Sequence, residues 1–236
     1  MGFLTQRQPL PGDISPPDAA SAAGAIERLN QRSGATGVIV RLFEHWCRRD
    51  TASRPLQLLV LGRGGVDIAR TVAARAQRLN RGVAITVVDR DVEALAPLNR
   101  GGAANEAGGE ASGRQITAIA ADPLAPPFDA NSFDYTLASL IGHDLPDLRV
   151  MMLLRVMYQL SRRGLVWSDL LRGRWAAAAC RWHTRAADPA ARHWLVRATA
   201  AGFLRGEVMD LRHRMELGFT HYFACGCERF VLAGQR

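Results

Sequence analysis

The feature that most constrains this chain is the stretch 58–70, whose sequence is LLVLGRGGVDIAR. Residues 58–61 are all apolar, which is typical of a strand buried on both faces. Glycines follow at 62, 64 and 65, and a glycine lets a ligand approach the backbone closely. A strand, a glycine turn and a helix in this order bring backbone N–H groups and a helix N-terminus to one place. The stretch therefore predicts a nucleotide-type binding site.

The segments after this turn alternate between strand and helix patterns. Strands are expected at about 56–61, 83–88, 115–121, 133–139 and 165–169. Helices are expected at about 66–80, 92–99 and 146–161, the last with Leu148, Met151, Met152 and Leu154 on its apolar face and closed by Gly164. Two further strands, one of them antiparallel, are expected near 205–212 and 220–233. This alternation predicts an α/β fold: a Rossmann-like, doubly wound, seven-stranded, mainly parallel sheet with helices on both faces.

The ends of the chain differ from this core. Residues 1–54 are predicted to be an N-terminal arm and helical cap, with a proline-containing arm over 1–20 and helices at about 20–31 and 37–49. Residues 55–236 form the expected ligand-binding domain, with a helical insert at about 171–204. At 236 residues the chain is long enough for one well-buried domain of this kind.

The charge is unevenly distributed. The net charge is +8 and every basic residue is arginine. Residues 1–148 hold 15 arginines against 16 acids, whereas residues 149–236 hold 15 against 6. The excess of arginine in residues 149–236 has two possible interpretations: the arginines lie on solvated helix faces, or they attract an anionic partner to the C-terminal third.

Composition excludes several other classes. No apolar run approaches the roughly 20 residues of a membrane helix, and residues 1–15 lack a signal-peptide pattern, so we expect a cytoplasmic protein without a membrane span. The cysteines at 47, 180, 225 and 227 form no C-x-x-C pair, so we expect no disulfide and no metal site.

The turn itself discriminates between ligands. The dinucleotide fingerprint is G-x-G-x-x-G/A, but here Gly62 and Gly64 are followed by Asp67 at the third position. A carboxylate there would face a pyrophosphate with like charge. S-adenosylmethionine (SAM) has no phosphate and carries a cationic sulfonium and ammonium, so Asp67 favours SAM.

Two more acids follow predicted strands, where an open α/β sheet binds its ligands. Asp89 ends the second strand, at the place for a carboxylate on ribose hydroxyls, although it also fits a helix N-cap. Asp122 ends the third strand and is placed to accept a hydrogen bond from an adenine amino group. The alternative for Asp122 is a turn former before Pro123.

Over about residues 56–172 the chain resembles the class I SAM-dependent methyltransferases of the small-molecule type, close to the ubiquinone/menaquinone-biosynthesis (type 11) group. The resemblance rests on six short motifs in the right order: LGRGGVDIA (61–69), VVDRD (87–91), ADP (121–123), PFDANSFD (127–134), SLIGHDL (139–145) and GLVWSDL (164–170). It implies a SAM cofactor, with S-adenosylhomocysteine (SAH) as product. The cofactor-binding residues it implies are Gly62, Gly64, Asp89, Asp122, Pro123 and Ser139. Arg63, Asp67 and Arg90 in the same motifs are further cofactor-binding candidates.

Two positions depart from this family. An acid usually stands two residues before the first glycine, where it supports the SAM ammonium group, and here that residue is Val60. Arg63 brings a cation into the turn beside a cationic ligand. Asp67 is a candidate to pair with either the SAM ammonium group or the Arg63 guanidinium.

The acceptor side offers fewer signals. The resemblance puts His143 at the end of the fourth strand beside the methyl group, and a neutral imidazole suits proton removal near pH 7. Arg172 is a candidate to hold an acceptor carboxylate, and Trp175 and Trp182 are candidates to stack on an aromatic acceptor. Each of these residues also has a structural alternative. The histidine could be bound to loop backbone, the arginine could be solvated, and the tryptophans could pack between helices.

The first hypothesis is thus a methyltransferase acting on an oxygen or carbon of a small aromatic or polyketide-like acceptor of secondary metabolism. The second is a methyltransferase-fold enzyme that performs a cyclisation or rearrangement, which Val60 and Arg63 favour. RNA methylation is a third, suggested only by the basic C-terminal third. The oligomeric state stays open, with a dimer among the options.

Overall fold

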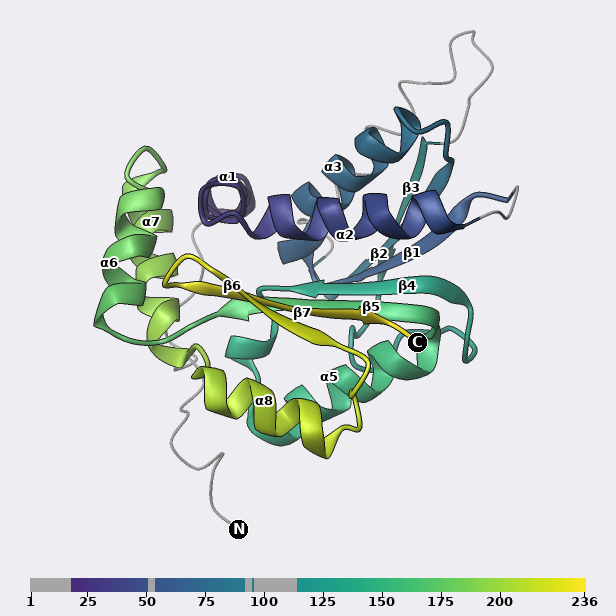
Figure 1. Cartoon of the computed structure of the whole chain (residues 1–236). Helices are drawn as coiled ribbons and strands as arrows, with labels where there is room; N and C mark the ends of the chain where they lie inside the picture. The colour runs from purple at the N-terminus through teal and green to yellow at the C-terminus, as the bar shows by residue number, and fades with distance from the viewer. Residues whose placement is uncertain (1–17, 51–53, 92–94, 96–113) are drawn as a thin grey trace, which may run out of the picture.

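The computed structural model of the chain has a seven-stranded sheet at its centre and helices on both of its faces (Figure 1). The structure describes residues 18–50, 54–91, 95 and 114–236. The strands are β1 (Leu56–Leu61), β2 (Val83–Asp89), β3 (Arg114–Ala120), β4 (Phe133–Ser139), β5 (Ser161–Leu170), β6 (His221–Cys225) and β7 (Arg229–Gln235). Their order is β3-β2-β1-β4-β5-β7-β6, and β7 runs antiparallel to both of its neighbours. This confirms the predicted fold class.

One face of the sheet is covered by α2 (Ala35–Arg49) and α3 (Val66–Gln77), and the other by α5 (Asp147–Leu160) and α8 (Arg205–Arg214). On the first face, Phe43 and Trp46 of α2 pack against Tyr135 of β4, and the Trp46 and Tyr135 rings stack with 4.8 Å between their centroids. The helix α2 therefore shares a hydrophobic core with the sheet.

A third group of helices lies beyond the ends of β4 and β5. Here α1 (Ala19–Arg32) packs against α6 (Arg174–His183) and α7 (Pro189–Ala198), which occupy the region of the predicted helical insert. Short 3-10 turns lie between the larger elements: η1 (Arg63–Gly65), η2 (Gly142–Asp144) and η3 (Thr199–Ala201). None of the described helices has the length and apolar character of a membrane-spanning segment.

The structure corrects three expectations about individual elements. Residues 205–214 form α8 rather than a strand, and Glu207 accepts the Leu204 N–H at 2.8 Å and so caps the start of this helix. Both final strands therefore lie within 221–235. Gly164 does not end a helix but lies inside β5, where a Cβ would overlap the Gly234 carbonyl oxygen of β7.

The third correction concerns the buried face of α5. Leu148 and Met152 are 76% and 50% exposed, whereas the buried residues are Val150, Leu153, Leu154, Met157 and Leu160. These follow the i, i+3, i+4, i+7 spacing of a core-facing stripe. Of the predicted face, Leu154 is buried and Met151 packs against the core while partly buried, so the prediction is wrong for Leu148 and Met152. The expected helix at 92–99 and the arm over 1–20 fall mainly outside the described residues.

Candidate functional site

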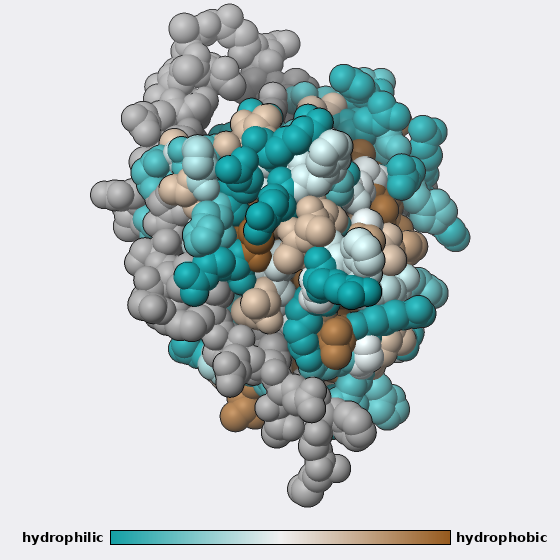
Figure 2. All heavy atoms as spheres, turned by 90° about the vertical axis from the view of Figure 1, so that its left-hand side faces the viewer, coloured by the Kyte–Doolittle hydropathy of each residue, from teal (hydrophilic) through white to brown (hydrophobic). Residues whose placement is uncertain are grey.

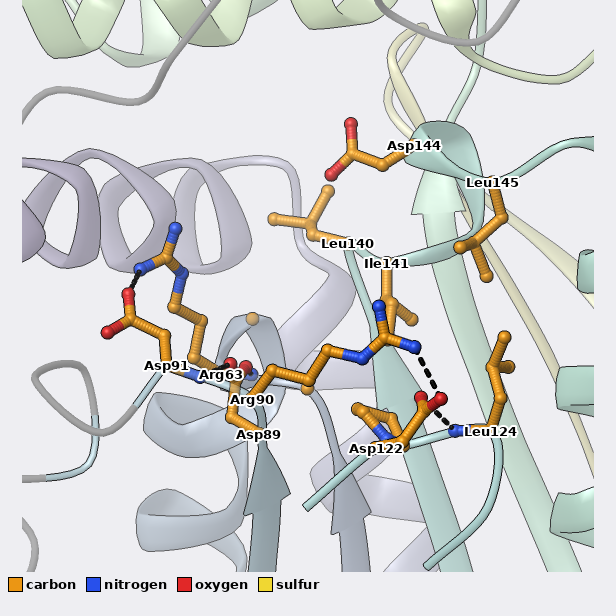
Figure 3. Close-up of a pocket in the computed structure, with 13 residues that line it drawn as sticks. Arg63, Asp89, Arg90, Asp91, Asp122, Leu124, Leu140, Ile141, Asp144 and Leu145 are labelled. Atoms are coloured by element: carbon orange, nitrogen blue, oxygen red, sulfur yellow. Dashed lines mark hydrogen bonds and ion pairs between the residues drawn. The ribbon is translucent and has the colours of Figure 1, made fainter. Parts of the chain in front are cut away.

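A cleft of about 260 Å³ opens at the C-terminal ends of β1, β2 and β4 (Figure 3). In an open, mainly parallel sheet this edge is where ligands bind. The cleft is lined by the turn after β1, by residues 89–91 and 122–124, and by residues 140, 141, 144 and 145. Seven of the predicted cofactor-binding residues line it: Gly62, Arg63, Gly64, Asp89, Arg90, Asp122 and Pro123.

The turn needs its glycines for two different reasons. Gly62 has a φ of +81°, a left-handed conformation that other residues adopt only with strain. At Gly64 a Cβ would overlap the carbonyl oxygen of Ser139 at the end of β4. Gly64 therefore allows the turn to pack directly on β4, which is a reason of packing rather than of ligand access.

Asp89 organises the end of β2. Its carboxylate accepts the Arg63 N–H at 2.7 Å and the Asp91 N–H at 2.9 Å. The Arg63 guanidinium in turn lies 2.7 Å from the Asp91 carboxylate (Figure 3). The cation in the turn is therefore neutralised by Asp91, and not by Asp67 as the sequence suggests.

Asp122 follows β3 on the same side of the cleft. It accepts the Leu124 N–H at 2.9 Å and forms an ion pair with Arg90. The hydrogen bond from Arg90 is the main reason why the pKa of Asp122 lies below its ordinary value. Both side chains are partly exposed, so solvent can stabilise each charge when a ligand replaces the ion pair.

The β4 side of the cleft is mostly apolar. Leu140, Ile141 and Leu145 line it together with the carboxylate of Asp144. Leu140 has a φ of +54°, an uncommon conformation for a bulky residue. Backbone strain of this kind is concentrated at functional sites.

Behind this wall lies a buried polar group. The imidazole of His143, 1% exposed, lies between two carboxylates: its Nδ1 is 2.8 Å from Asp169 and its Nε2 is 3.2 Å from Asp144. Asp169 also accepts the Gly142 N–H at 2.6 Å. Of these side chains, Asp144 lines the cleft and His143 and Asp169 do not.

The charges of this pair follow from its surroundings. Burial on its own would lower the pKa of His143, but attraction to Asp144 and Asp169 outweighs it and raises the pKa above 6.5. Burial would likewise raise the pKa of Asp169, but attraction and hydrogen bonding to His143 hold that pKa below 3.8. These shifts favour an imidazolium at His143 over the neutral base expected from the sequence.

Arg229 of β7 completes the buried group. It is fully buried and donates to the hydroxyl groups of Ser139 at 3.0 Å and Ser168 at 2.7 Å. Its Nε and Nη1 have no hydrogen-bond partner in the described part of the chain. Burial lowers the pKa of Arg229, and the nearby Asp169 and Asp67 oppose that effect. Ser139 is therefore a buried partner of Arg229 and does not line the cleft.

The remaining predicted residues lie apart from the cleft. Asp67 accepts a hydrogen bond from Asn30 of α1 at 2.9 Å, and burial raises its pKa. Arg172 is held by Glu207 through two hydrogen bonds of 2.6 and 2.7 Å. Trp175 and Trp182 are 67% and 64% exposed on α6. The cleft is lined by none of Asp67, Arg172, Trp175 and Trp182.

Sequence reasoning did not assign roles to Asp91, Asp144, Asp169 and Arg229. The first three lie inside the quoted motifs, at the end of a predicted strand or in the loop that follows one, and that position was the available signal. Arg229 had a weaker signal, which is a single arginine at the start of the apolar run FVLA in the last strand.

No family model and no curated protein sequence matches this chain. Solved structures do match it in fold. One is a SAM-dependent methyltransferase from Aquifex aeolicus, with 11% identity, 92% of this chain and 98% of that chain covered, and a TM-score of 0.58. Another is the plantazolicin methyltransferase BpumL in complex with SAH, with 12% identity, 92% and 96% covered, and a TM-score of 0.61.

A third match is the magnesium protoporphyrin IX methyltransferase of Synechocystis PCC 6803 with bound SAH. Its identity is 12%, the coverage is 86% of this chain and 84% of that chain, and the TM-score is 0.56. The chain therefore has the fold of class I SAM-dependent methyltransferases, and identities this low show the fold alone.

Proposed function

We propose that this protein is a SAM-dependent methyltransferase that acts on a small-molecule acceptor in the cytoplasm. The observation that carries the proposal is the charge of the cleft. Four carboxylates line it, those of Asp89, Asp91, Asp122 and Asp144, against the two guanidinium groups of Arg63 and Arg90. This excess of negative charge favours a cationic sulfonium ligand over a dinucleotide pyrophosphate.

The residues around the cleft fit the parts of SAM. The turn from Gly62 to Gly64 admits the methionine part, and Asp89 accepts hydrogen bonds from ribose hydroxyls. Asp122 receives the adenine amino group once Arg90 moves away from it. When bound, SAM supplies an electrophilic methyl group on its sulfonium.

The β4 side of the cleft is the place for the acceptor. Leu140, Ile141 and Leu145 provide an apolar wall that suits an aromatic or polyketide-like molecule of secondary metabolism. Asp144 takes the acceptor's hydroxyl proton on its carboxylate as the acceptor oxygen or carbon is methylated. His143 is a positioning residue behind it, because its imidazolium contacts Asp144 and is itself held by Asp169.

Calorimetry with SAM and SAH tests the proposal. We expect binding in the micromolar range, and transfer of a labelled methyl group to at least one member of a panel of phenols and polyketide-like enols. Failure to bind either ligand at millimolar concentration would rule out the proposal.

One observation favours a second candidate function. Val60 is fully buried in the core, so no carboxylate stands at the position where the family supports the SAM ammonium group. An enzyme that binds SAM but catalyses a cyclisation or rearrangement would fit this change. Binding of SAM without methyl transfer to any tested acceptor would favour this candidate.

A further inference from the structure

Helix α6 has an exposed aromatic face that plays no part in the cleft. Trp175 and Trp182 are seven residues apart, so they project from the same face about 10 Å apart. Both side chains are mainly exposed, and the exposed Ala178 lies between them. Ala176 and Cys180, on the opposite side of the helix, are buried. These two small residues, rather than the tryptophans, pack α6 onto the protein.

Arginines accompany both tryptophans. The Arg174 guanidinium lies 5.2 Å from the ring centre of Trp175, and that of Arg185, just after the helix, lies 4.1 Å from the ring centre of Trp182. Arg181 is exposed beside them. Within the described part of the chain, the ion pairs join carboxylates to other cations and not to these three arginines.

The surrounding segment is strongly basic. Residues 172–205 contain seven arginines and a single acid, Asp188. The Asp188 carboxylate caps α7, where it accepts the N–H groups of Ala190 and Ala191 at 2.9 Å. Arg172 is paired with Glu207 of α8, and the other six arginines form no ion pair among the residues that the structure describes.

The position of α6 indicates which partners can reach this face. The helix lies at the outer edge of the molecule, beyond the sheet (Figure 1). Figure 2 views this side and shows long hydrophilic side chains around paler and more apolar residues. An outward-facing helix suits a broad, flat partner.

We propose that the α6 face, defined as Trp175 and Trp182 with Arg174, Arg181 and Arg185, docks on the surface of an anionic phospholipid bilayer. Tryptophan rings are stabilised at the level of lipid headgroups, where one part of the ring is in an apolar layer and the N–H stays hydrated. The arginines at their sides face the lipid phosphates, which bind guanidinium groups strongly. The face thus offers both signals, apolar insertion and charge attraction, that peripheral binding uses.

A bilayer fits these observations better than a nucleic acid does. Single-stranded RNA binds in a basic groove that follows its backbone, with bases stacked on open aromatic rings. On α6 the two rings project from an outward-facing helix, and an arginine already lies over each ring. The residue between them, Ala178, has no side-chain group to bind a base.

Vesicle co-sedimentation of the full chain tests this proposal. We expect the protein to sediment with vesicles of equal phosphatidylcholine and phosphatidylglycerol at moderate salt, and to stay in solution with phosphatidylcholine alone. Replacing both tryptophans (Trp175→Ala with Trp182→Ala) is expected to weaken binding by at least about tenfold. Replacing the three arginines by glutamine is expected to weaken it at least as much and to remove its salt dependence.

A matched control is available on α5, where Leu148 and Met152 are also exposed. Replacing both by alanine removes exposed apolar side chains on another face, and we expect vesicle binding to change by less than about twofold. Thermal unfolding and SAM calorimetry on every variant separate this proposal from the proposed function, because the α6 variants are expected to retain both properties of the unchanged protein.

Three outcomes would overturn the proposal. The first is a wild-type protein that stays in solution with anionic vesicles, and the second is a double tryptophan variant that still sediments fully. The third is loss of RNA binding, or of self-association in sedimentation equilibrium, in the α6 variants while vesicles are not bound. That result would assign the face to a nucleic acid or to a second copy of the chain.

Discussion

The cleft and the buried group behind it use the same kinds of side chain in opposite ways. In the cleft, the pairs Arg63–Asp91 and Arg90–Asp122 are partly exposed to solvent. In the buried group, His143, Asp169 and Arg229 have almost no exposed surface. A ligand can therefore replace the partner of a charged side chain in the cleft, whereas the charged side chains of the buried group must keep their partners.

The physical reason is the cost of leaving a charge without its partner. An exposed ion pair contributes only about 0–1 kcal/mol, because water replaces the lost partner. A buried charge that loses its partner typically costs about 3–5 kcal/mol. We therefore expect substitutions in the cleft to change ligand affinity, and substitutions in the buried group to change stability.

The largest effect is expected from Asp169→Ala. This change removes the carboxylate that holds His143 and accepts the Gly142 and Leu170 N–H groups. It also takes away the nearest carboxylate of the buried His143 and weakens the compensation of the buried Arg229. The free energy of unfolding, measured by urea denaturation, is expected to fall by about 3–5 kcal/mol. The control is Asp210→Ala, which removes an exposed pair with Arg214 and is expected to cost less than about 0.5 kcal/mol. Equal losses in both variants would contradict the contrast between the two regions.

Asp89→Ala should have the largest effect on the cleft. It removes the carboxylate proposed to hold the ribose and the acceptor of the Arg63 and Asp91 N–H groups. SAM affinity measured by calorimetry is expected to fall by about 10- to 100-fold, since hydrogen bonds to a charged group contribute about 1.5–3 kcal/mol. Unchanged affinity would place the cofactor elsewhere.

The sequence allowed the sheet and much of the cleft to be predicted, because both depend on local patterns. Apolar runs that end in glycine or aspartate located β1 to β3 and placed Asp89 and Asp122 at one edge. The local sequence pattern did not predict that Asp67 lies apart from the cleft and is hydrogen-bonded to α1. Its partner Asn30 is 37 positions away, and that contact depends on how α1 packs.

The buried group was harder to predict for a related reason. Residues from β4, β5 and β7 meet there, and Arg229 is 90 positions from Ser139. A short pattern cannot show that an arginine in the last strand lies beside hydroxyl groups of two other strands. The exposed side of α5 could not be predicted because most residues of this helix are apolar, so periodicity did not separate one face from another.

The pH dependence of stability provides a third test, centred on His143→Gln. Because the folded pKa of His143 is raised, its contribution is fully present below pH 6.5 and is lost as the pH rises through the folded pKa. Because the folded pKa of Asp169 is lowered, its contribution is present above pH 3.8 and is lost as the pH falls through the folded pKa. The His143–Asp169 pair therefore stabilises the fold most between pH 3.8 and pH 6.5.

Urea denaturation at several pH values measures this contribution. Between about pH 4 and 6.5 the His143→Gln variant is expected to be less stable than wild type by about 1.5 kcal/mol. Above about pH 6.5 the difference is expected to shrink as the imidazolium of the wild type loses its proton. A difference that stays constant up to about pH 9 would show that the imidazole contributes by packing and not by its charge.

The smallest effect is expected from Arg90→Ala, and it tests whether the cleft pairs are exchangeable. Removing this exposed side chain is expected to change the free energy of unfolding by less than about 0.5 kcal/mol. If Arg90 must leave Asp122 before the adenine binds, its removal should raise SAM affinity by up to about fivefold, the range of one weak surface pair. Asp122→Ala is the partner control and should lower the affinity. A loss of affinity in the Arg90→Ala variant would mean that Arg90 contacts the ligand, and that the ion pair is part of the binding site and not a competitor for it.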